Sequence, residues 1–388
     1  MTTLLLFIIY LAFISLGLPD ALLGSAWPVM QNELQVSASF AGIITMIISG
    51  GTILSSLFSD RLTKKFGTGL VTAGSVLLTA LELFGFSISQ SFWLLCLFAV
   101  PYGIGAGAVD ASINNFAAVH YSSKHMNWLH CMWGIGAAIS PYIMSYYLTG
   151  IKGWTGGYQA VALIQICLTL ILFMTLPLWK RAGAPQEQAE EQTESSHTSL
   201  KDVLKIKGVP FVLLAFFGYC AAESTIILWA SSYLVTCRSV NMITAAKFGA
   251  LFLIGITIGR FLSGFISEKL GDRKMIRLGC SIFLVGIILV ILPVPSGTFA
   301  FVGLILSGLG CAPIYPAIIH STPANFGAEQ SQAIVGIQMA SAYVGSTFVP
   351  PLFGVIASQH MEIFPYFLLV FACLIIVMSE KLNRAIKS

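Results

Sequence analysis

Long apolar runs, broken at short intervals by polar residues, Gly or Pro, cover almost the whole chain. A helix that crosses a bilayer needs about 20 mostly apolar residues, and these runs have that length. The pattern therefore predicts an all-α membrane protein with twelve transmembrane helices. The expected spans are 4–30, 38–58, 68–89, 92–118, 126–149, 157–179, 208–236, 243–266, 275–294, 298–320, 331–356 and 361–379.

One polar stretch near the middle divides this pattern into two halves of six helices. It reads "KRAGAPQEQAEEQTESSHTSLKDVLKIK", which is typical of a solvated linker with room for a short amphipathic helix near its end. We therefore expect an N-terminal bundle over 1–179, a cytoplasmic linker over 180–207 and a C-terminal bundle over 208–388.

The two halves share landmarks at matching positions. The loop "SSLFSDRLTKKFG" after the second expected helix corresponds to "LSGFISEKLGDRKM" after the eighth, and Pro141 in the fifth helix corresponds to Pro350 in the eleventh. An even number of helices per half gives both halves the same orientation in the membrane. Parallel repeats of this kind occur in transporters that bind their substrate between two bundles.

Composition supports a membrane location. Only 9% of the 388 residues are charged, whereas soluble domains carry about 25% charged residues. The net charge of +4 comes from short basic clusters rather than one basic surface, which argues against nucleic-acid binding. Lys and Arg concentrate in alternate loops, so the positive-inside rule predicts a multi-pass plasma (inner) membrane protein with both termini cytoplasmic. We expect a monomer in the lipid bilayer.

Enzyme motifs are missing from the sequence. It contains no H-E-x-x-H, no G-x-S-x-G and no phosphate-binding loop, and its eight cysteines form no C-x-x-C pair. We therefore expect no enzymatic activity, no metal site and no cofactor apart from a coupling H⁺ or Na⁺.

The two repeated loops carry a recognisable motif. Asp60 with Arg61, and Glu268 with Lys269, occupy the [Asp/Glu]-[Arg/Lys] positions of the pattern small-x-x-x-[Asp/Glu]-[Arg/Lys]-x-x-[Lys/Arg]. This pattern resembles the signature loop of the major facilitator superfamily. The resemblance implies two pseudo-symmetric six-helix bundles over the whole chain.

Polar residues inside the apolar runs are candidate functional residues, because a charge at bilayer depth is costly and must face the bundle interior. Asp20 follows Pro19 at a weakened point of the first helix and shares a helix face with Trp27. The carboxylate can bind a polar substrate, or it can fix helix packing alone.

The fourth and fifth expected helices carry a second polar group. Asp110 and Asn114 lie one turn apart, and the hairpin geometry predicts that Asn114 lies level with His130. Together with Asn127 they offer carboxylate, amide and imidazole groups for sugar hydroxyls, while aromatic rings such as Trp133 can stack on a sugar. His130 can equally form a structural hydrogen bond between helices.

The C-terminal half carries fewer charges. Glu223 lies near the position equivalent to Asp20, so a substrate or coupling role is possible. Gln338 can line a cavity wall with Tyr315 and His320, although such residues can also simply pack. We expect two other charged residues to be structural: Arg260 as an ion-pair partner near the loop acid, and Glu82 on an outer helix or interface.

Three segments narrow the resemblance. "PDALLGSAW", "DASINNF" and "NWLHCMWGIGA" look like helix-one, helix-four and helix-five motifs of the fucose:proton symporter family. The resemblance implies that Asp20 binds sugar and that Asp110 takes up the proton. The sequence departs from the family where Asp110 replaces Glu and His130 replaces Gln.

The sequence as a whole thus predicts a secondary active transporter that takes up a monosaccharide by proton or sodium symport with alternating access. An exporter of drugs or other amphipathic solutes with the same fold is the alternative. The expected coupling residues are Asp110 and Glu223. The expected substrate-binding residues are Asp20, Trp27, Asn114, Asn127, His130, Trp133 and Gln338.

Overall fold

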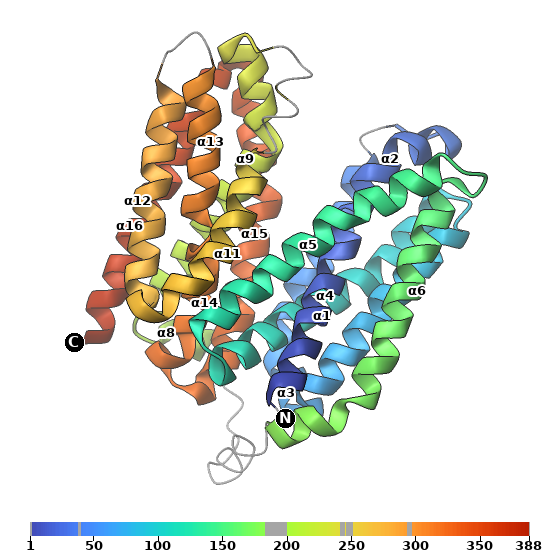
Figure 1. Ribbon diagram of the computed structural model, residues 1–388, viewed down its shortest axis with the longest axis horizontal. Helices are drawn as coiled ribbons and strands as arrows, with labels where there is room; N and C mark the ends of the chain where they lie inside the picture. Colours follow the sequence, from blue (N-terminus) through green and yellow to red (C-terminus); the bar gives the residue numbers. More distant parts are fainter. Residues whose placement is uncertain are drawn as a thin grey trace. The chain divides into compact units, whose positions relative to one another are not determined.

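The computed structural model describes residues 2–37, 40–182, 200–240, 245, 251–292 and 297–387, and the regular structure within these ranges is helical (Figure 1). The N-terminal part contains α1 (Thr2–Asp20), α2 (Leu22–Glu33), α3 (Phe40–Ile88), α4 (Phe92–His120), α5 (Ser123–Leu148) and α6 (Gly153–Met174). The C-terminal part contains α8 (Leu200–Lys205), α9 (Val209–Arg238), α11 (Leu251–Leu270), α12 (Asp272–Ile291), α13 (Thr298–Cys311), α14 (Ile314–Phe326), α15 (Ala328–His360), the 3₁₀ turn Met361–Ile363 and α16 (Phe364–Lys387).

The prediction of an all-α membrane protein is confirmed. In the described residues, ten helices are long and apolar enough to cross a membrane. The element α3 contains two of the twelve expected spans, because Gly67 with φ 76° and ψ 152° turns the chain between them. The remaining span is α5, which has 26 residues but a more polar sequence. The helices are thus consistent with twelve crossings.

The described chain forms two compact units. Unit 1 comprises residues 1–116 and 129–198, and unit 2 comprises residues 117–128 and 199–388. The short segment 117–128, which contains the turn between α4 and α5, therefore groups with the C-terminal helices. Most of the linker, residues 183–199, lies outside the described residues, whereas α8 is the short helix expected near its end.

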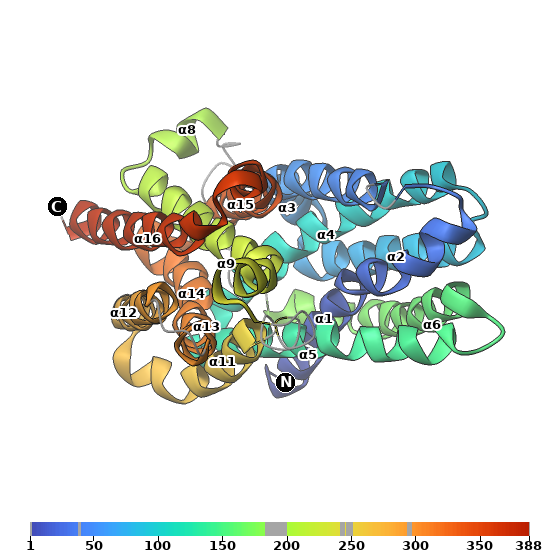
Figure 2. The same cartoon turned by 90° about the horizontal axis from the view of Figure 1, so that it is seen from above.

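Each unit packs an apolar core with helices in close approach. In unit 1 the core includes Trp27, Phe86 and Tyr158. In unit 2, α9 lies against α15 and α16, and α13 lies against α11 and α12 (Figure 2). Gly255 and Gly308 allow α11 and α13 to approach closely, since a methyl group on Gly255 would lie 3.1 Å from the Gly308 Cα.

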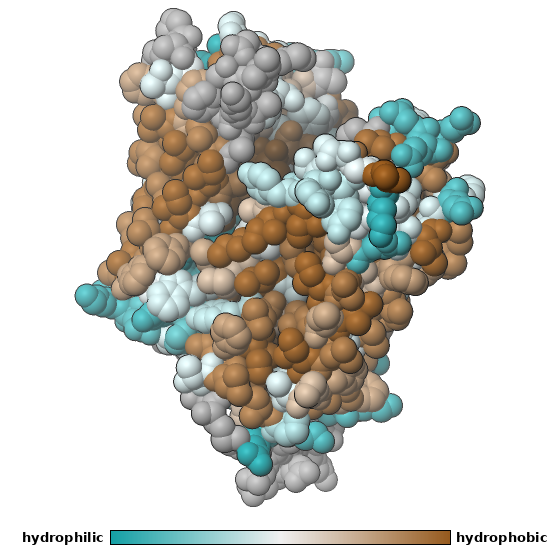
Figure 3. All heavy atoms as spheres, turned by 45° about the vertical axis from the view of Figure 1, so that its right-hand side comes forward, coloured by the Kyte–Doolittle hydropathy of each residue, from teal (hydrophilic) through white to brown (hydrophobic). Residues whose placement is uncertain are grey.

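Apolar side chains also cover much of the molecular surface, as the face in Figure 3 shows. Exposed large residues include Trp93 at 77%, Leu163 at 62% and Val370 at 65% accessibility. A water-soluble protein rarely exposes such continuous apolar area, but a helix bundle in lipid requires it.

Candidate functional site

Asp20 is the centre of a polar site in unit 1. It is the last residue of α1, and helical hydrogen bonding resumes in α2 after Ala21, so the expected weak point of the first helix lies here. Asp20 Oδ1 accepts a hydrogen bond of 2.6 Å from the Tyr102 hydroxyl of α4, and Oδ2 accepts one of 2.9 Å from Trp133 Nε1 of α5. Asp20 is exposed as a residue, while both of its carboxylate oxygens are engaged by these donors.

Both donors to Asp20 are neutral groups. A hydroxyl and an indole N–H stabilise the carboxylate through hydrogen bonds without cancelling its charge. The sequence predicted Trp133 as a stacking surface, and the structure instead gives its N–H a direct bond to Asp20. Tyr102 was not predicted, although its position two turns before Asp110 on the same helix was a usable signal.

Asp110, Asn114 and His130 form a second group in unit 1. Asn114 Nδ2 donates to Asp110 Oδ1 at 2.7 Å and to the Asp110 carbonyl oxygen at 2.9 Å. His130 Nε2 lies 3.1 Å from Asn114 Oδ1, and because an amide oxygen can only accept, Nε2 is the donor. The predicted level of Asn114 with His130 is confirmed. The result is a chain of carboxylate, amide and imidazole, with Asn114 completely buried.

Two predicted substrate residues of the first six helices lie differently from the expectation. Trp27 is only 7% exposed and packs in the apolar core of unit 1, so its ring faces side chains rather than open space. Asn127 belongs to the segment that groups with unit 2, and its Nδ2 donates to the Ser123 carbonyl oxygen at 2.8 Å. Its side-chain oxygen has no hydrogen-bond partner among the described residues.

Glu223 of α9 forms a buried ion pair with Arg260 of α11. The Glu223 Oε1–Arg260 Nη2 distance is 3.5 Å, and the side chains are 17% and 4% exposed. The predicted structural ion-pair role of Arg260 is confirmed: Arg260 lies two turns before Glu268 on α11, and its partner is Glu223 on α9. The pair lies beside an aromatic cluster in which the Tyr219 and Tyr315 rings are 5.9 Å apart.

Gln338 of α15 is completely buried in unit 2. Its Oε1 accepts a hydrogen bond of 3.1 Å from Thr322 Oγ1 of α14. Its Nε2 has no hydrogen-bond partner among the described residues. The amide therefore links two helices through its oxygen, and its NH₂ group makes no hydrogen bond within the described residues.

Glu82 of α3 lies on the inward side of its helix. It was expected on an outer helix or at an interface, and with 3% exposure it agrees with the interface alternative. Its Oε2 has no hydrogen-bond partner in the described part of the chain. The polar residues Ser75, Thr79 and Glu82 share one face of α3, opposite the exposed Leu77 and Leu81, as expected for a helix whose apolar face points to lipid.

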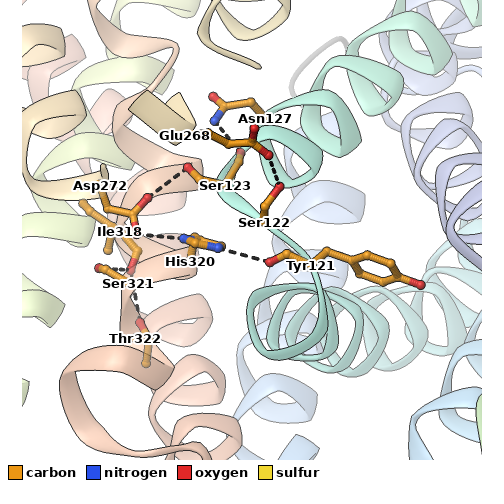
Figure 4. A network of polar contacts seen from close by, with 10 residues as sticks. All are labelled: Tyr121, Ser122, Ser123, Asn127, Glu268, Asp272, Ile318, His320, Ser321 and Thr322. Carbon is orange, nitrogen blue, oxygen red and sulfur yellow. Dashed lines mark hydrogen bonds and ion pairs between the residues drawn. The ribbon is translucent and has the colours of Figure 1, made fainter. Parts of the chain in front are cut away.

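A further polar network lies within unit 2, at the turn between α4 and α5 (Figure 4). Ser122 Oγ donates to Glu268 Oε1 at 2.6 Å, and Ser123 Oγ donates to Asp272 Oδ1 at 2.9 Å. His320 of α14 bonds to Asp272 Oδ2 through Nδ1 at 2.7 Å and to the Tyr121 carbonyl oxygen through Nε2 at 3.1 Å. Three helices of unit 2 thus hold the turn.

The described residues contain no group of three or more His, Cys, Asp or Glu side chains that could hold a metal ion. The polar sites are instead small sets of hydrogen-bonding groups. They suit a hydroxylated solute or a single cation.

Comparisons with known proteins give the family context. The sequence model of the Major Facilitator Superfamily matches residues 9–296 and 238–380. Over 89% of this chain and 75% of the relative, the sequence is 24% identical to "Bypass of stop codon protein 6" of Saccharomyces cerevisiae. It is 22% identical to the glucose/mannose transporter GlcP of Bacillus subtilis, covering 89% of this chain and 86% of GlcP. It is 23% identical to the quinolone resistance protein NorA of Staphylococcus aureus, covering 98% and 96%.

Solved structures show the same fold. The structure of the E. coli fucose:proton symporter FucP in the outward conformation matches with a TM-score of 0.81, over 97% of each chain and with 16% identity. The proton:xylose symporter XylE matches with a TM-score of 0.80 over 98% of this chain and 95% of XylE, with 10% identity.

Proposed function

Because this chain belongs to the major facilitator superfamily, and is therefore a transporter rather than an enzyme, we propose that it takes up a monosaccharide by cation symport. The Asp20 site carries this proposal. Asp20 is an exposed residue, and its carboxylate is held by two neutral donors from two different helices. Sugar hydroxyls offer donors of the same kind, so a sugar can replace or join them at the carboxylate.

The sugar-binding role extends to groups near Asp20. Trp133 is half-buried, and its indole N–H donates to Asp20, so the Trp133 ring lies beside the Asp20 carboxylate. Aromatic rings bind the apolar faces of sugars, while carboxylates bind their hydroxyls. The sugar specificities in the names of GlcP, FucP and XylE agree with this class of substrate.

The coupling cation is assigned to Asp110. This half-buried carboxylate accepts a hydrogen bond from the neutral amide of Asn114. A carboxylate at bilayer depth can bind H⁺ or Na⁺, and binding removes its charge before the helix bundles move. We favour a proton, because the group offers few oxygen ligands for Na⁺. His130 steadies the Asn114 amide by its hydrogen bond.

We place the protein as a monomer in the plasma membrane with both termini cytoplasmic. Basic residues cluster around the turns at Gly67 and Gly271, and the positive-inside rule assigns these turns to the cytoplasm.

Export of amphipathic solutes is the second candidate. NorA covers almost the full length of this chain, and its name assigns it to quinolone resistance. Dye efflux from cells, in the absence of sugar uptake, would favour this function over symport.

The test is uptake of labelled hexoses and pentoses into proteoliposomes under an imposed proton or sodium gradient. Asp20→Asn keeps the shape but weakens a charged acceptor, which lowers apparent sugar affinity by about tenfold or more. Asp202→Asn is the matched control, because Asp202 lies on α8 with its side chain 60% exposed. Absence of gradient-driven uptake for every sugar, with folded protein, refutes the proposal.

A further inference from the structure

The turn between α4 and α5 is bound through residues that the proposed transport mechanism does not use. Tyr121, Ser122 and Ser123 each bond to a different helix or side chain of unit 2, and Figure 4 shows His320 and Asp272 together at the centre of this network. Asp272 is the first residue of α12, directly after Gly271 with φ 73°, so the short connection from α11 positions its carboxylate.

The two hydrogen bonds of His320 determine its protonation state. The partner of Nδ1 is a carboxylate oxygen at 2.7 Å, and the partner of Nε2 is a backbone carbonyl oxygen at 3.1 Å. Both partners can only accept a hydrogen bond. Neutral imidazole has a single N–H, so only the charged imidazolium supplies both donors.

Loss of this proton must therefore cost one of the two bonds. Neutral His320 can keep its bond to Asp272 or its bond to Tyr121, but not both. A hydrogen bond that involves a charged group contributes about 1.5–3 kcal/mol, which corresponds to roughly a ten- to hundredfold change in the equilibrium for release of the turn. The bonds from Ser122 and Ser123 do not depend on this proton.

We propose that His320 is a proton-binding site that latches the Tyr121–Ser123 turn to α12 and α14. With the proton bound, the turn is held at Asp272 and the Tyr121 carbonyl; after the proton leaves to solvent, the turn is released. Because the turn joins α4 to α5, release frees the helices that carry Asp110 and His130. Only this link to transport rests on the proposed function; the latch itself does not.

Other charged groups surround the latch and influence the site. Burial raises the pKa of the Tyr121 phenol to about 12, so this hydroxyl stays neutral throughout the range in which His320 titrates. The charged or titratable residues nearest to the latch in sequence on the elements that meet here are His120 of α4, Lys124 and His125 of α5, Glu268 and Lys269 of α11, and Asp272, Arg273 and Lys274 of α12.

The first test is direct detection of the imidazolium by ¹⁵N NMR of histidine-labelled full-length protein. The difference spectrum against His320→Gln identifies the signal of this residue among the six histidines. We expect both ring nitrogens to show the protonated chemical shift at pH 6. A neutral tautomer at that pH overturns the proposal.

The second test is hydrogen–deuterium exchange of the segment 117–128 between pH 5.5 and 9, with labelling times scaled for the intrinsic rate. We expect protection to fall at least tenfold as pH rises. The Gln side chain of His320→Gln can donate well to only one of the two acceptors, Asp272 or the Tyr121 carbonyl oxygen. We therefore expect low protection of the segment at every pH. Ser123→Ala should lower protection but keep its pH dependence, and His360→Gln, at the exposed end of α15, should change nothing. Protection of the wild-type turn that does not vary with pH refutes the latch, whether or not the protein transports sugar.

Discussion

The carboxylates of Asp20 and Asp110 in unit 1 have different partners from the Glu223 carboxylate in unit 2. In unit 1, Asp20 and Asp110 are bonded to neutral donors, namely Tyr102, Trp133 and Asn114. In unit 2, Glu223 faces the guanidinium of Arg260 at 3.5 Å. A carboxylate with neutral partners retains a charge that a solute or cation can compensate, whereas an ion-paired carboxylate is already compensated.

Under the proposed function, this difference gives the two halves separate roles. Asp20 and Asp110 of unit 1 are the proposed sites for sugar and proton. Unit 2 holds an internally balanced pair and the histidine latch at the α4–α5 turn. The two halves share sequence landmarks but differ in the partners of their acidic side chains. In both halves, glycines allow neighbouring helices to approach closely.

We expect the largest effect from a substitution of Arg260, which removes the ion pair with Glu223. Arg260→Met leaves Glu223 as an uncompensated buried charge, and we expect the free energy of unfolding to fall by about 3–5 kcal/mol. The measurement is thermal or denaturant unfolding of the purified protein in detergent. The double variant Glu223→Gln with Arg260→Met should recover most of the loss, because it removes both charges. Equal destabilisation of the single and double variants would contradict the ion-pair explanation.

The coupling role of unit 1 is tested at Asp110. Asp110→Asn mimics a permanently neutral carboxyl, so it should remove accumulation against a gradient while sugar exchange across the membrane continues. Counterflow and gradient-driven uptake in the same proteoliposomes separate these two activities. Accumulation that persists in Asp110→Asn would exclude this residue from coupling.

Variants of His130 test whether its hydrogen bond to Asn114 contributes to transport. His130→Leu removes the donor to Asn114 Oδ1, which should weaken sugar-dependent activity by about fivefold, the equivalent of about 1 kcal/mol. His130→Gln can still donate and should stay close to wild type. The measurement is the apparent sugar affinity of each variant. Equal affinities of His130→Leu and His130→Gln would show that the hydrogen bond to Asn114 does not contribute to sugar binding.

The smallest effect is expected at Glu82. No ion pair to Glu82 forms among the described residues, so Glu82→Gln replaces the carboxyl by an amide of equal size without stranding a cation. We expect a change below about 1 kcal/mol in the free energy of unfolding, measured beside Arg260→Met. A loss as large as that of Arg260→Met would reveal a charged partner and remove the contrast between the units.

Most of the site in unit 1 was predictable from local pattern. The weak point at Pro19 and Asp20 follows from proline chemistry, and the Asp110, Asn114 and His130 group follows from helical spacing and a short hairpin. Tyr102 and Trp133 as partners of Asp20 were not predicted, because partner choice depends on how three helices rotate about their axes. Trp27 was predicted to face a substrate but packs in the core for the same reason.

The sequence by itself determined that the chain is a helical membrane protein and where its apolar spans lie, because length, hydropathy and periodicity are local properties of the chain. The tertiary structure decided which acids are compensated: it brings Arg260 to Glu223, buries Glu82 and joins His320 to Asp272 and the Tyr121 carbonyl. These contacts link residues from 37 to 199 positions apart. Their formation depends on helix packing, which local pattern does not encode.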